Sequence, residues 1–247
     1  IREIRSRFGL TAREAKKAIQ ERVDLQELCY QYEYGTTYLA KNFLRPVRIA
    51  SRFILKPPGT FCDGLAGDDL EITIEPGISF GSGQHPTTCL CLEAIDWLFT
   101  ERRLPRRPDG IDAADIGTGS GVLALALCRA GIRSCRAYEI DPVSINEARK
   151  NIVHNRMDDR VRVIGEPMSR RSGAYGIICA NLRFPTLKIL AELMHDSLAD
   201  KGLIVLSGVR EWEKRDLLDY FIEHGFVPAW QEDRKKWSAF VMMKEPD

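Results

Sequence analysis

The sequence predicts a doubly wound α/β fold with a mostly parallel, seven-stranded sheet and a small helical extension at the N-terminus. Two observations carry this prediction. From residue 84 onward, strand-like and helix-like patterns alternate, which is typical of a parallel sheet covered by helices on both faces. In addition, the segment 115–121, Asp-Ile-Gly-Thr-Gly-Ser-Gly, ends one apolar run and opens the next, as a turn from a strand into a helix does.

Residues 1–45 are predicted to form the helical N-terminal extension. Thr11 is followed three residues later by Glu14, which is the capping-box pattern at the start of a helix. Asp24 and Glu27 repeat the same spacing. We therefore expect a hairpin of two short helices, near residues 12–22 and 25–33.

Residues 46–83 are predicted to be a linker that contains one strand and the loop Phe-Gly-Ser-Gly at 80–83. Between positions 35 and 70 the chain has three prolines and four glycines, which interrupt regular structure. The alternation of apolar and polar residues over 47–55 predicts a single extended strand within this linker.

Residues 84–247 are predicted to form the main domain. A helical pattern over 89–99 precedes a buried strand at 112–116, and the apolar run 122–128 reads as a packed helix. Four further strands of the parallel sheet are expected near 135–140, 161–165, 176–181 and 203–208. Two final apolar-rich runs, 226–231 and 237–244, lie close enough in sequence to pair as antiparallel strands.

Composition limits the classes of protein that this chain can belong to. A chain of 247 residues with 44% hydrophobic content can bury one core and one small appendage. We find no segment long enough to span a membrane and no signal sequence, and we expect a cytoplasmic protein. The seven cysteines are odd in number and several fall in predicted core elements, so we expect reduced thiols. Their spacing does not suggest a metal site.

The charge of the chain leaves direct nucleic-acid binding open. A net charge of +1 argues against a large basic surface that would bind nucleic acid of any sequence. However, residues 1–50 contain ten Lys or Arg against six Asp or Glu, so this part carries +4 and the remainder −3. A basic arm is one interpretation; an ordinary solvated helix face is the one we favour.

The glycine-rich turn indicates a nucleotide-type cofactor. Glycine has no Cβ, so its backbone can approach a ligand closely, and the N–H groups at the start of a helix favour a negative or polar group. Glu139 lies 22 positions after Gly117, at the end of the next strand, where a carboxylate can accept hydrogen bonds from both ribose hydroxyls. The dinucleotide pattern requires a third glycine at position 122, which is Val122 here. A tight turn without any ligand is the alternative interpretation.

A second unusual segment, Glu-Pro-Gly-Ile-Ser-Phe-Gly-Ser-Gly-Gln-His-Pro-Thr-Thr over 75–88, lies just before the predicted helix at 89–99. Together with the glycine turn at 115–121, Glu-Ile-Asp-Pro at 139–142, Ala-Asn-Leu at 180–182 and Leu-Ser-Gly at 206–208, it resembles the ribosomal protein L11 methyltransferases. These belong to the class I S-adenosylmethionine-dependent methyltransferases, which have a Rossmann-like fold. The resemblance covers roughly residues 70–245 and makes 84–247 the methyltransferase domain.

The resemblance implies the cofactor and its binding residues. S-adenosyl-L-methionine would be held by Thr88, Gly117, Gly119, Glu139 and Asn181. Thr88 would offer a hydroxyl near the methionine carboxylate, the two glycines would let the backbone pass close to the methionine portion, and Glu139 would hold the ribose. Glu166 is a weaker candidate for the adenine amine, with a surface glutamate as the alternative.

Asn181 is the catalytic candidate, because amides at this position of related enzymes hold the amine that accepts the methyl group. The sequence Asn-Leu-Arg-Phe departs from the Asn-Pro-Pro-Tyr of methyltransferases that act on bases and glutamine. The resemblance therefore implies transfer to a lysine or a terminal amine of a protein, and a large-subunit ribosomal protein is the first candidate substrate. No residue stands out as a dedicated base, and His85 is expected to bond to the loop backbone.

The N-terminal part departs from the family. The ribosomal-protein enzymes usually carry a substrate-gripping domain of alternating strands and helices, whereas residues 1–45 are predicted here to be helical. Substrate identity does not carry over with the cofactor site for this reason. Two alternatives stay open: a methyltransferase for nucleic acid or a small molecule, and a non-catalytic module that binds the cofactor or a partner.

Overall fold

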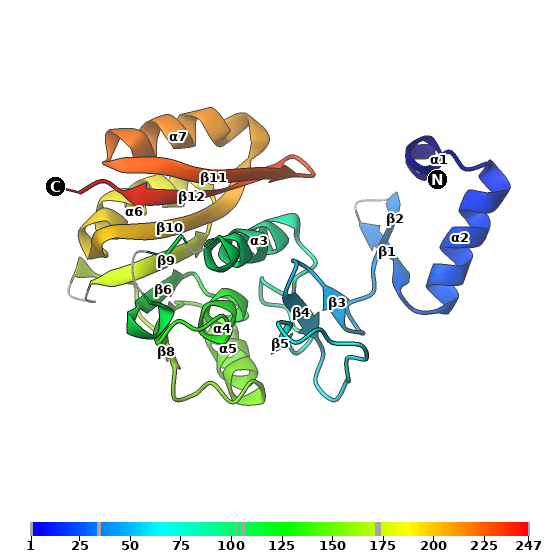
Figure 1. Cartoon of the computed structure of the whole chain (residues 1–247), viewed down its shortest axis with the longest axis horizontal. Coiled ribbons are helices and arrows are strands. Elements are labelled where there is room, and N and C mark those ends of the chain that lie inside the picture. The colour runs from blue at the N-terminus through cyan, green and yellow to red at the C-terminus, as the bar shows by residue number, and fades with distance from the viewer. Residues whose placement is uncertain (1, 34–35, 102, 105–106, 171–173, 247) are drawn as a thin grey trace.

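A seven-stranded sheet forms the centre of the C-terminal part of the molecule (Figure 1). The computed structural model describes residues 2–33, 36–101, 103–104, 107–170 and 174–246. The strand order is β11-β12-β10-β9-β6-β7-β8. The strands span Asp112–Ile116 (β6), Ser134–Tyr138 (β7), Val161–Ile164 (β8), Tyr175–Asn181 (β9), Leu198–Arg210 (β10), Phe226–Arg234 (β11) and Trp237–Lys244 (β12).

Five of these strands run parallel, and the C-terminal hairpin completes the sheet in the opposite sense. β6 pairs in parallel with β7 and β9, β7 with β8, and β9 with β10. β12 is antiparallel to both β10 and β11. The predicted doubly wound, mostly parallel sheet of seven strands is confirmed, and so is the closing hairpin. β10 is longer than the predicted 203–208, and β7 ends one residue before Glu139.

Helices cover both faces of the sheet, which explains why its strands have few polar residues. One layer contains α3 (Pro86–Thr100), α4 (Val122–Arg129) and α5 (Pro142–His154); the other contains α6 (Phe184–Ser197) and α7 (Lys214–Glu223). Successive residues of β9 alternate between the two cores: Ile177 packs with the α3–α4 layer and Ile178 with the α6–α7 layer. Both are fully buried.

The N-terminal extension differs from its prediction. It contains two helices, α1 (Arg2–Phe8) and α2 (Ala12–Asp24), followed by an antiparallel hairpin of β1 (Leu28–Glu33) and β2 (Thr36–Lys41). The capping box of Thr11 and Glu14 is present, but the helix predicted over 25–33 is wrong. Gln26 adopts a left-handed φ of 57° directly after α2 and ends the helix there. The residues that follow are rich in tyrosine, which favours strands.

Residues 46–83 contain three strands, whereas one was predicted. β3 (Val47–Arg48) and β4 (Phe53–Lys56) are antiparallel, and β5 (Leu70–Thr73) runs parallel to β4. The predicted single strand over 47–55 is wrong because the chain reverses between β3 and β4. Apolar side chains of this sheet, including Phe53 and Ile72, are fully buried in the core beneath α3 and α4. The domain boundaries predicted at 45 and 83 stay predictions.

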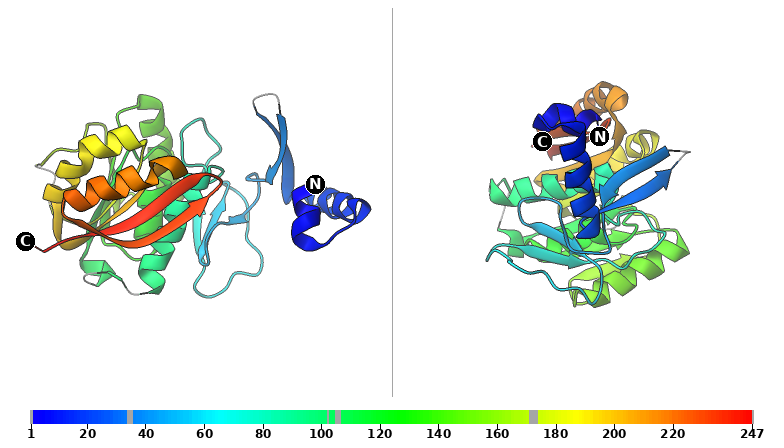
Figure 2. Two further views of the ribbon diagram at one scale, coloured as in Figure 1. Left: turned by 90° about the horizontal axis from the view of Figure 1, so that it is seen from above. Right: turned by 90° about the vertical axis from the view of Figure 1, so that its right-hand side faces the viewer.

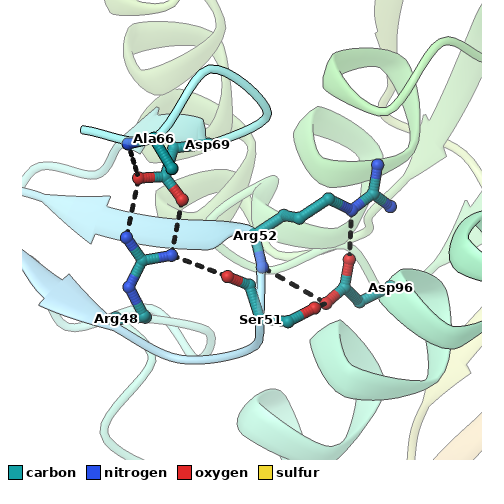
Figure 3. Close-up of polar contacts among 6 residues, drawn as sticks. All are labelled: Arg48, Ser51, Arg52, Ala66, Asp69 and Asp96. Atoms are coloured by element: carbon teal, nitrogen blue, oxygen red, sulfur yellow. Dashed lines mark hydrogen bonds and ion pairs between the residues drawn. The ribbon is translucent and has the colours of Figure 1, made fainter.

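The reversal between β3 and β4 is held by Asp96 of α3 (Figure 3). Its carboxylate accepts hydrogen bonds from Ser51 Oγ, from the backbone N–H of Arg52 at 3.3 Å, and from Arg52 Nε at 2.7 Å. Arg48 forms a two-pronged ion pair with Asp69, at 2.5 and 2.7 Å, which fixes the loop before β5. The contacts of Asp96 attach the small sheet to the main domain, whereas the Arg48–Asp69 pair holds the small sheet together.

The small sheet lies between the main domain and the N-terminal extension, which stands at the far end of the molecule (Figure 2). Phe43, just after β2, packs against the core of the main domain, so the extension and the body are joined near the base of the hairpin. Within the described part of the chain, every helix is too short or too polar to cross a membrane.

Candidate functional site

The glycine-rich turn connects the end of β6 to the start of α4. Gly117, Gly119 and Gly121 have φ values of +70°, +54° and +84°, which L side chains rarely adopt. A Cβ atom on Gly119 would overlap the backbone carbonyl oxygen of Phe80. The turn therefore requires glycine both for its conformation and for the close approach of the loop at 80–83.

Asp115, two residues before Gly117, stabilises this turn through hydrogen bonds. It is fully buried in β6, and its Oδ2 accepts hydrogen bonds from Thr118 Oγ1 at 2.5 Å and from the backbone N–H of Ala124 at 3.2 Å. Burial raises the pKa of the Asp115 carboxyl to about 6, against the lowering effect of these two hydrogen bonds. Asp115 thus links the turn to the first residues of α4.

Glu139 faces the glycine-rich turn from the end of β7. Its Oε1 accepts from the N–H groups of Ile140 and Asp141 at 2.8 and 3.0 Å, and its Oε2 accepts from the N–H of Gly119 at 3.0 Å. The carboxylate is therefore oriented by backbone donors on both sides. A ligand with two neighbouring hydroxyl groups could replace the bond to Gly119 and use the same oxygens.

Asn181 ends β9, next to β10. In the parallel register it pairs with Ser207, and the N–H of Leu182 donates to the Ser207 carbonyl at 3.1 Å. Gly208 adopts a φ of +86° and lies against the backbone of Leu182, so the chain turns sharply after Asn181. Asn181 Oδ1 is buried and has no hydrogen-bond partner among the described residues. Buried acceptors in proteins normally have a hydrogen-bond partner, and a donor group of a ligand could fill this role at Asn181 Oδ1.

A loop that follows β5 covers the glycine-rich turn and is fastened to α5. The N–H of Ser120 donates to the Phe80 carbonyl at 2.8 Å. Asn151 of α5 joins the two loops, because its Nδ2 donates to the Ser120 carbonyl at 2.8 Å and its Oδ1 accepts from the N–H of Glu75 at 2.9 Å. The Glu147 carboxylate, one helical turn earlier, accepts from the N–H of Ser79 at 3.0 Å. We call residues 75–83 the cover loop.

These elements enclose a cavity of about 470 Å³ at the carboxyl ends of β6, β7 and β9, which is where parallel sheets bind ligands. Four predicted site residues line it: Gly117, Gly119, Glu139 and Asn181. Glu166, the weaker candidate, lines it as well. Ile140 and Leu182, which belong to two of the motifs, line it too, and lining residues that the sequence did not single out include Ser144, Met168, Thr186 and Leu190. Thr186 and Leu190 are four apart on the helix after Asn181, and this spacing was the available signal.

Thr88, the fifth predicted site residue, does not line this cavity. It lies in the first turn of α3, which begins at Pro86, three residues before the predicted helical pattern over 89–99, and it is fully buried. Its hydroxyl has no hydrogen-bond partner in the described part of the chain. His85 caps this helix: its Nδ1 lies 2.7 Å from Thr87 Oγ1 and accepts from the N–H of Thr87 at 3.3 Å. These contacts of His85 are made with the first turn of α3, and its expected bond to the loop backbone stays a prediction.

Comparison with known proteins gives consistent matches. The family model described as ribosomal protein L11 methyltransferase (PrmA) matches residues 22–245. A ribosomal protein L11 methyltransferase of Geotalea daltonii is 31% identical over 211 residues, covering 83% of this chain and 66% of the relative. The ribosomal protein L11 methyltransferase of Anoxybacillus flavithermus is 26% identical over 254 residues. This match covers 98% of this chain and 78% of the relative. The chain thus spans only part of these relatives.

Among solved structures, a ribosomal protein L11 methylase of Lactobacillus delbrueckii subsp. bulgaricus superposes with a TM-score of 0.71 at 23% identity. The superposition covers 82% of this chain and 100% of the other. A methyltransferase of Pyrococcus furiosus superposes with a TM-score of 0.55 at 20% identity. At these identities the two structures support the fold.

Proposed function

Because the chain belongs to the ribosomal protein L11 methyltransferase family, we propose that it transfers methyl groups from S-adenosyl-L-methionine to amino groups of a protein. The lysine side chains and terminal amine of ribosomal protein L11 are the acceptors to test first. The chain covers 66% of the length of the Geotalea relative, so the activity and the substrate of the whole protein are part of this proposal.

One observation carries the proposal: the glycine-rich turn with Gly117 and Gly119, the end of β7 with Glu139 and the end of β9 with Asn181 are three separate parts of the chain that line one cavity. A tight turn without a ligand would not require a carboxylate and an asparagine with an unpartnered amide oxygen to line the same cavity. The cavity also has the apolar walls with few polar groups that are common in cofactor sites.

The residues of the cavity fit S-adenosylmethionine. This cofactor supplies a methyl group that is already activated by a positively charged sulfur. Glu139 would accept hydrogen bonds from the ribose hydroxyls, and the backbone of Gly117 and Gly119 would pass beside the methionine portion. Ile140 and Met168 would offer apolar contacts to the adenine. Thr88 stays in the proposal because its buried hydroxyl has no partner among the described residues, although it lies outside the cavity lining.

Asn181 would orient the acceptor amine. Its Oδ1 can accept a hydrogen bond from an N–H of the neutral amine and so direct the nitrogen lone pair toward the methyl group. A lysine with an ordinary pKa of about 10.4 is neutral in only about one molecule in 2,500 at pH 7. The apolar side chains of Leu182, Leu190 and Phe80 around the cavity disfavour the charged ammonium and would increase the neutral fraction.

Transfer of radiolabelled methyl from S-adenosylmethionine to purified ribosomal protein L11 of the same organism tests the proposal. We expect label in L11 and none after its amines are acetylated. Asn181→Ala should lower kcat by about 100-fold, which is typical for loss of one positioned polar group at the reacting atoms. Asn146→Ala, on an exposed position of α5, is the matched control and should retain full activity.

Two results would contradict the proposal. Label that enters RNA or small molecules of a lysate in place of protein would support a different acceptor class. Equal rates for Asn181→Ala and Asn146→Ala would remove Asn181 from the catalytic role.

A further inference from the structure

We propose that the tip of the β11–β12 hairpin and the chain just after β10 form a binding surface for single-stranded RNA beside the cavity. This tip surface consists of Arg210, Trp212, Lys235, Lys236 and Trp237. The choice of RNA over DNA rests on the proposed function, because a ribosomal acceptor is found together with RNA. The surface itself rests on the four observations below.

The first observation is a stack of aromatic rings and a cation. The guanidinium carbon of Arg210 lies 3.6 Å from the ring centre of Trp237 and 5.5 Å from that of Trp212. Trp212 is 69% exposed, which is unusual for a tryptophan, and its ring is available for another flat group. Nucleic-acid bases stack on exposed aromatic rings of this kind, and arginine adds a cation–π contribution.

The second observation is the strained turn between β11 and β12. Arg234 pairs with Trp237, so Lys235 and Lys236 form a two-residue loop. Their φ values are +47° and +66°. Such loops favour Asn-Gly, because residues with a bulky side chain are strained in the left-handed region. Two lysines at these positions reduce stability, and strain of this kind accumulates at functional sites.

The third observation concerns charge. Among the described residues, Arg210, Lys235 and Lys236 form no ion pair. Two acidic residues, Glu211 and Glu213, flank Trp212, and Glu213 accepts a hydrogen bond from the backbone N–H of Arg210 at 2.8 Å. The carboxylates next to the hairpin have other partners: Asp233 binds Lys214 at 2.7 Å and Glu93 binds Arg234 at 2.6 Å. Three cations against the carboxylates of Glu211 and Glu213 leave the tip surface a net charge of +1, with the two lysines at the turn farthest along the chain from these carboxylates.

The fourth observation is that the tip surface is continuous with the cavity. The His85 ring lies 4.9 Å from that of Trp237 and 5.0 Å from that of Phe80, which lines the cavity. On the other side, Arg210 lies three residues beyond Ser207, the β10 partner of Asn181. Figure 1 shows the hairpin tip reaching past α3 toward the N-terminal extension. A strand bound there would run past the mouth of the cavity.

These observations favour RNA over an acidic peptide. Positive charges alone would suit either ligand, but here the cations alternate with aromatic rings, and this arrangement matches alternating phosphates and bases. Three unpaired cations also predict binding that weakens steeply with salt, because phosphate contacts release counterions.

Fluorescence anisotropy of a labelled uridine 12-mer, titrated with the full chain at several salt concentrations, tests the proposal. Replacing the turn by Asn-Gly, with Lys235→Asn and Lys236→Gly, removes two charges and relaxes the strain, so the variant should melt at the same or a higher temperature. We expect weaker binding and a salt slope that is smaller by about 1.4, at about 0.7 per phosphate contact. Trp212→Ala should weaken binding about 5- to 150-fold, which corresponds to the loss of one stacked base.

The matched control removes two charges elsewhere, with Lys16→Gln and Lys17→Gln on an exposed part of α2. This variant should bind the 12-mer within about twofold of the parent. Equal weakening of binding in the control variant would mean that the whole chain attracts the 12-mer by its overall charge, and this result would overturn the proposal. No binding of the 12-mer, or full displacement by oligoglutamate at equal concentration, would overturn it too. The assay contains neither methyl donor nor acceptor protein, so its result does not depend on the outcome for methyl transfer.

Discussion

The backbone N–H of Gly119 donates a hydrogen bond to Glu139 Oε2 at 3.0 Å, which joins the glycine-rich turn to the end of the neighbouring strand. Gly119 also lies against the carbonyl of Phe80 in the cover loop. Three separate segments of the chain thus meet at one glycine. The geometry of the proposed cofactor site depends on this meeting point.

Glu139→Ala is expected to weaken S-adenosylmethionine binding about 10- to 150-fold, since hydrogen bonds to a charged group contribute about 1.5–3 kcal/mol. Isothermal titration calorimetry measures this change. Glu223→Ala, an exposed glutamate at the end of α7, is the control and should bind normally. Changes in the β1–β2 hairpin should have smaller effects than Glu139→Ala, and equal effects at both places would refute the assigned role.

Gly119→Ala is expected to weaken cofactor binding by at least about tenfold and to lower stability by about 1–3 kcal/mol. The new Cβ would overlap the Phe80 carbonyl at a residue whose φ is +54°, so both strain and displacement of the cover loop contribute. Chemical denaturation and calorimetry give the two quantities. Gly67→Ala provides the comparison, because nothing lies within 4 Å of a Cβ at Gly67 and its φ is not in the left-handed region. Equal effects of the two substitutions would contradict the argument.

Asp115 predicts a dependence of stability on pH. Burial raises its pKa to about 6 in the folded protein, from an ordinary value of 3.8. The folded state therefore binds more protons than the unfolded state between these values, so the Asp115 contribution is fully present below pH 3.8 and is lost as pH rises through 6. The shift corresponds to about 3 kcal/mol, at about 1.36 kcal/mol per pKa unit.

Asp115→Asn isolates this contribution, because an amide oxygen can still accept from Thr118 and Ala124. The difference in unfolding free energy between the variant and the parent should change by about 2.4 kcal/mol in favour of the variant between pH 4 and pH 7, which is most of the full shift. Urea denaturation at each pH measures it. A difference that is constant across this range would show that Asp115 does not titrate there.

The turn variant with Lys235→Asn and Lys236→Gly is expected to be more stable than the parent by about 1–2 kcal/mol. Both lysines have left-handed φ values, whereas Asn tolerates this region and Gly adopts it freely. Lys235→Ala with Lys236→Ala removes the same charges but retains the strain, so it should gain little. Thermal denaturation of the two variants separates strain from charge, and equal melting temperatures would contradict the strain argument.

Sequence patterns predicted the sheet well because its strands are buried on both faces and its helices pack as amphipathic layers. The helix over 25–33 was wrong because Asp24 and Glu27 match a helix start by local spacing alone, while Gln26 ends the preceding helix. The reversal between β3 and β4 depends on Asp96, more than 40 residues away in sequence, and no local pattern reveals such a contact. The family resemblance pointed to Asn181, and its place at the cavity follows because it is the last residue of a buried strand. The position of Thr88 outside the cavity lining depends on how α3 packs.

Asn151 shows how a residue outside the cavity could control it. Its side chain is almost fully buried and bonds both to the N–H of Glu75 and to the carbonyl of Ser120, so one side chain sets the distance between the cover loop and the glycine-rich turn. Asn151→Ala would leave both backbone groups without this partner. We expect a loss of about 2–4 kcal/mol of stability, because each unpaired buried group costs about 1–3 kcal/mol.

The same substitution should have an effect that a purely structural residue would not show. Hydrogen exchange should accelerate in residues 75–83 and 117–121 more than in the strands of the sheet, and KM for S-adenosylmethionine should rise more than kcat falls. Arg149→Ala, on an exposed face of the same helix, serves as the control. Uniform acceleration of exchange throughout the domain would mean that Asn151 supports the fold in general, and the cover loop would then lose its specific link to cofactor binding.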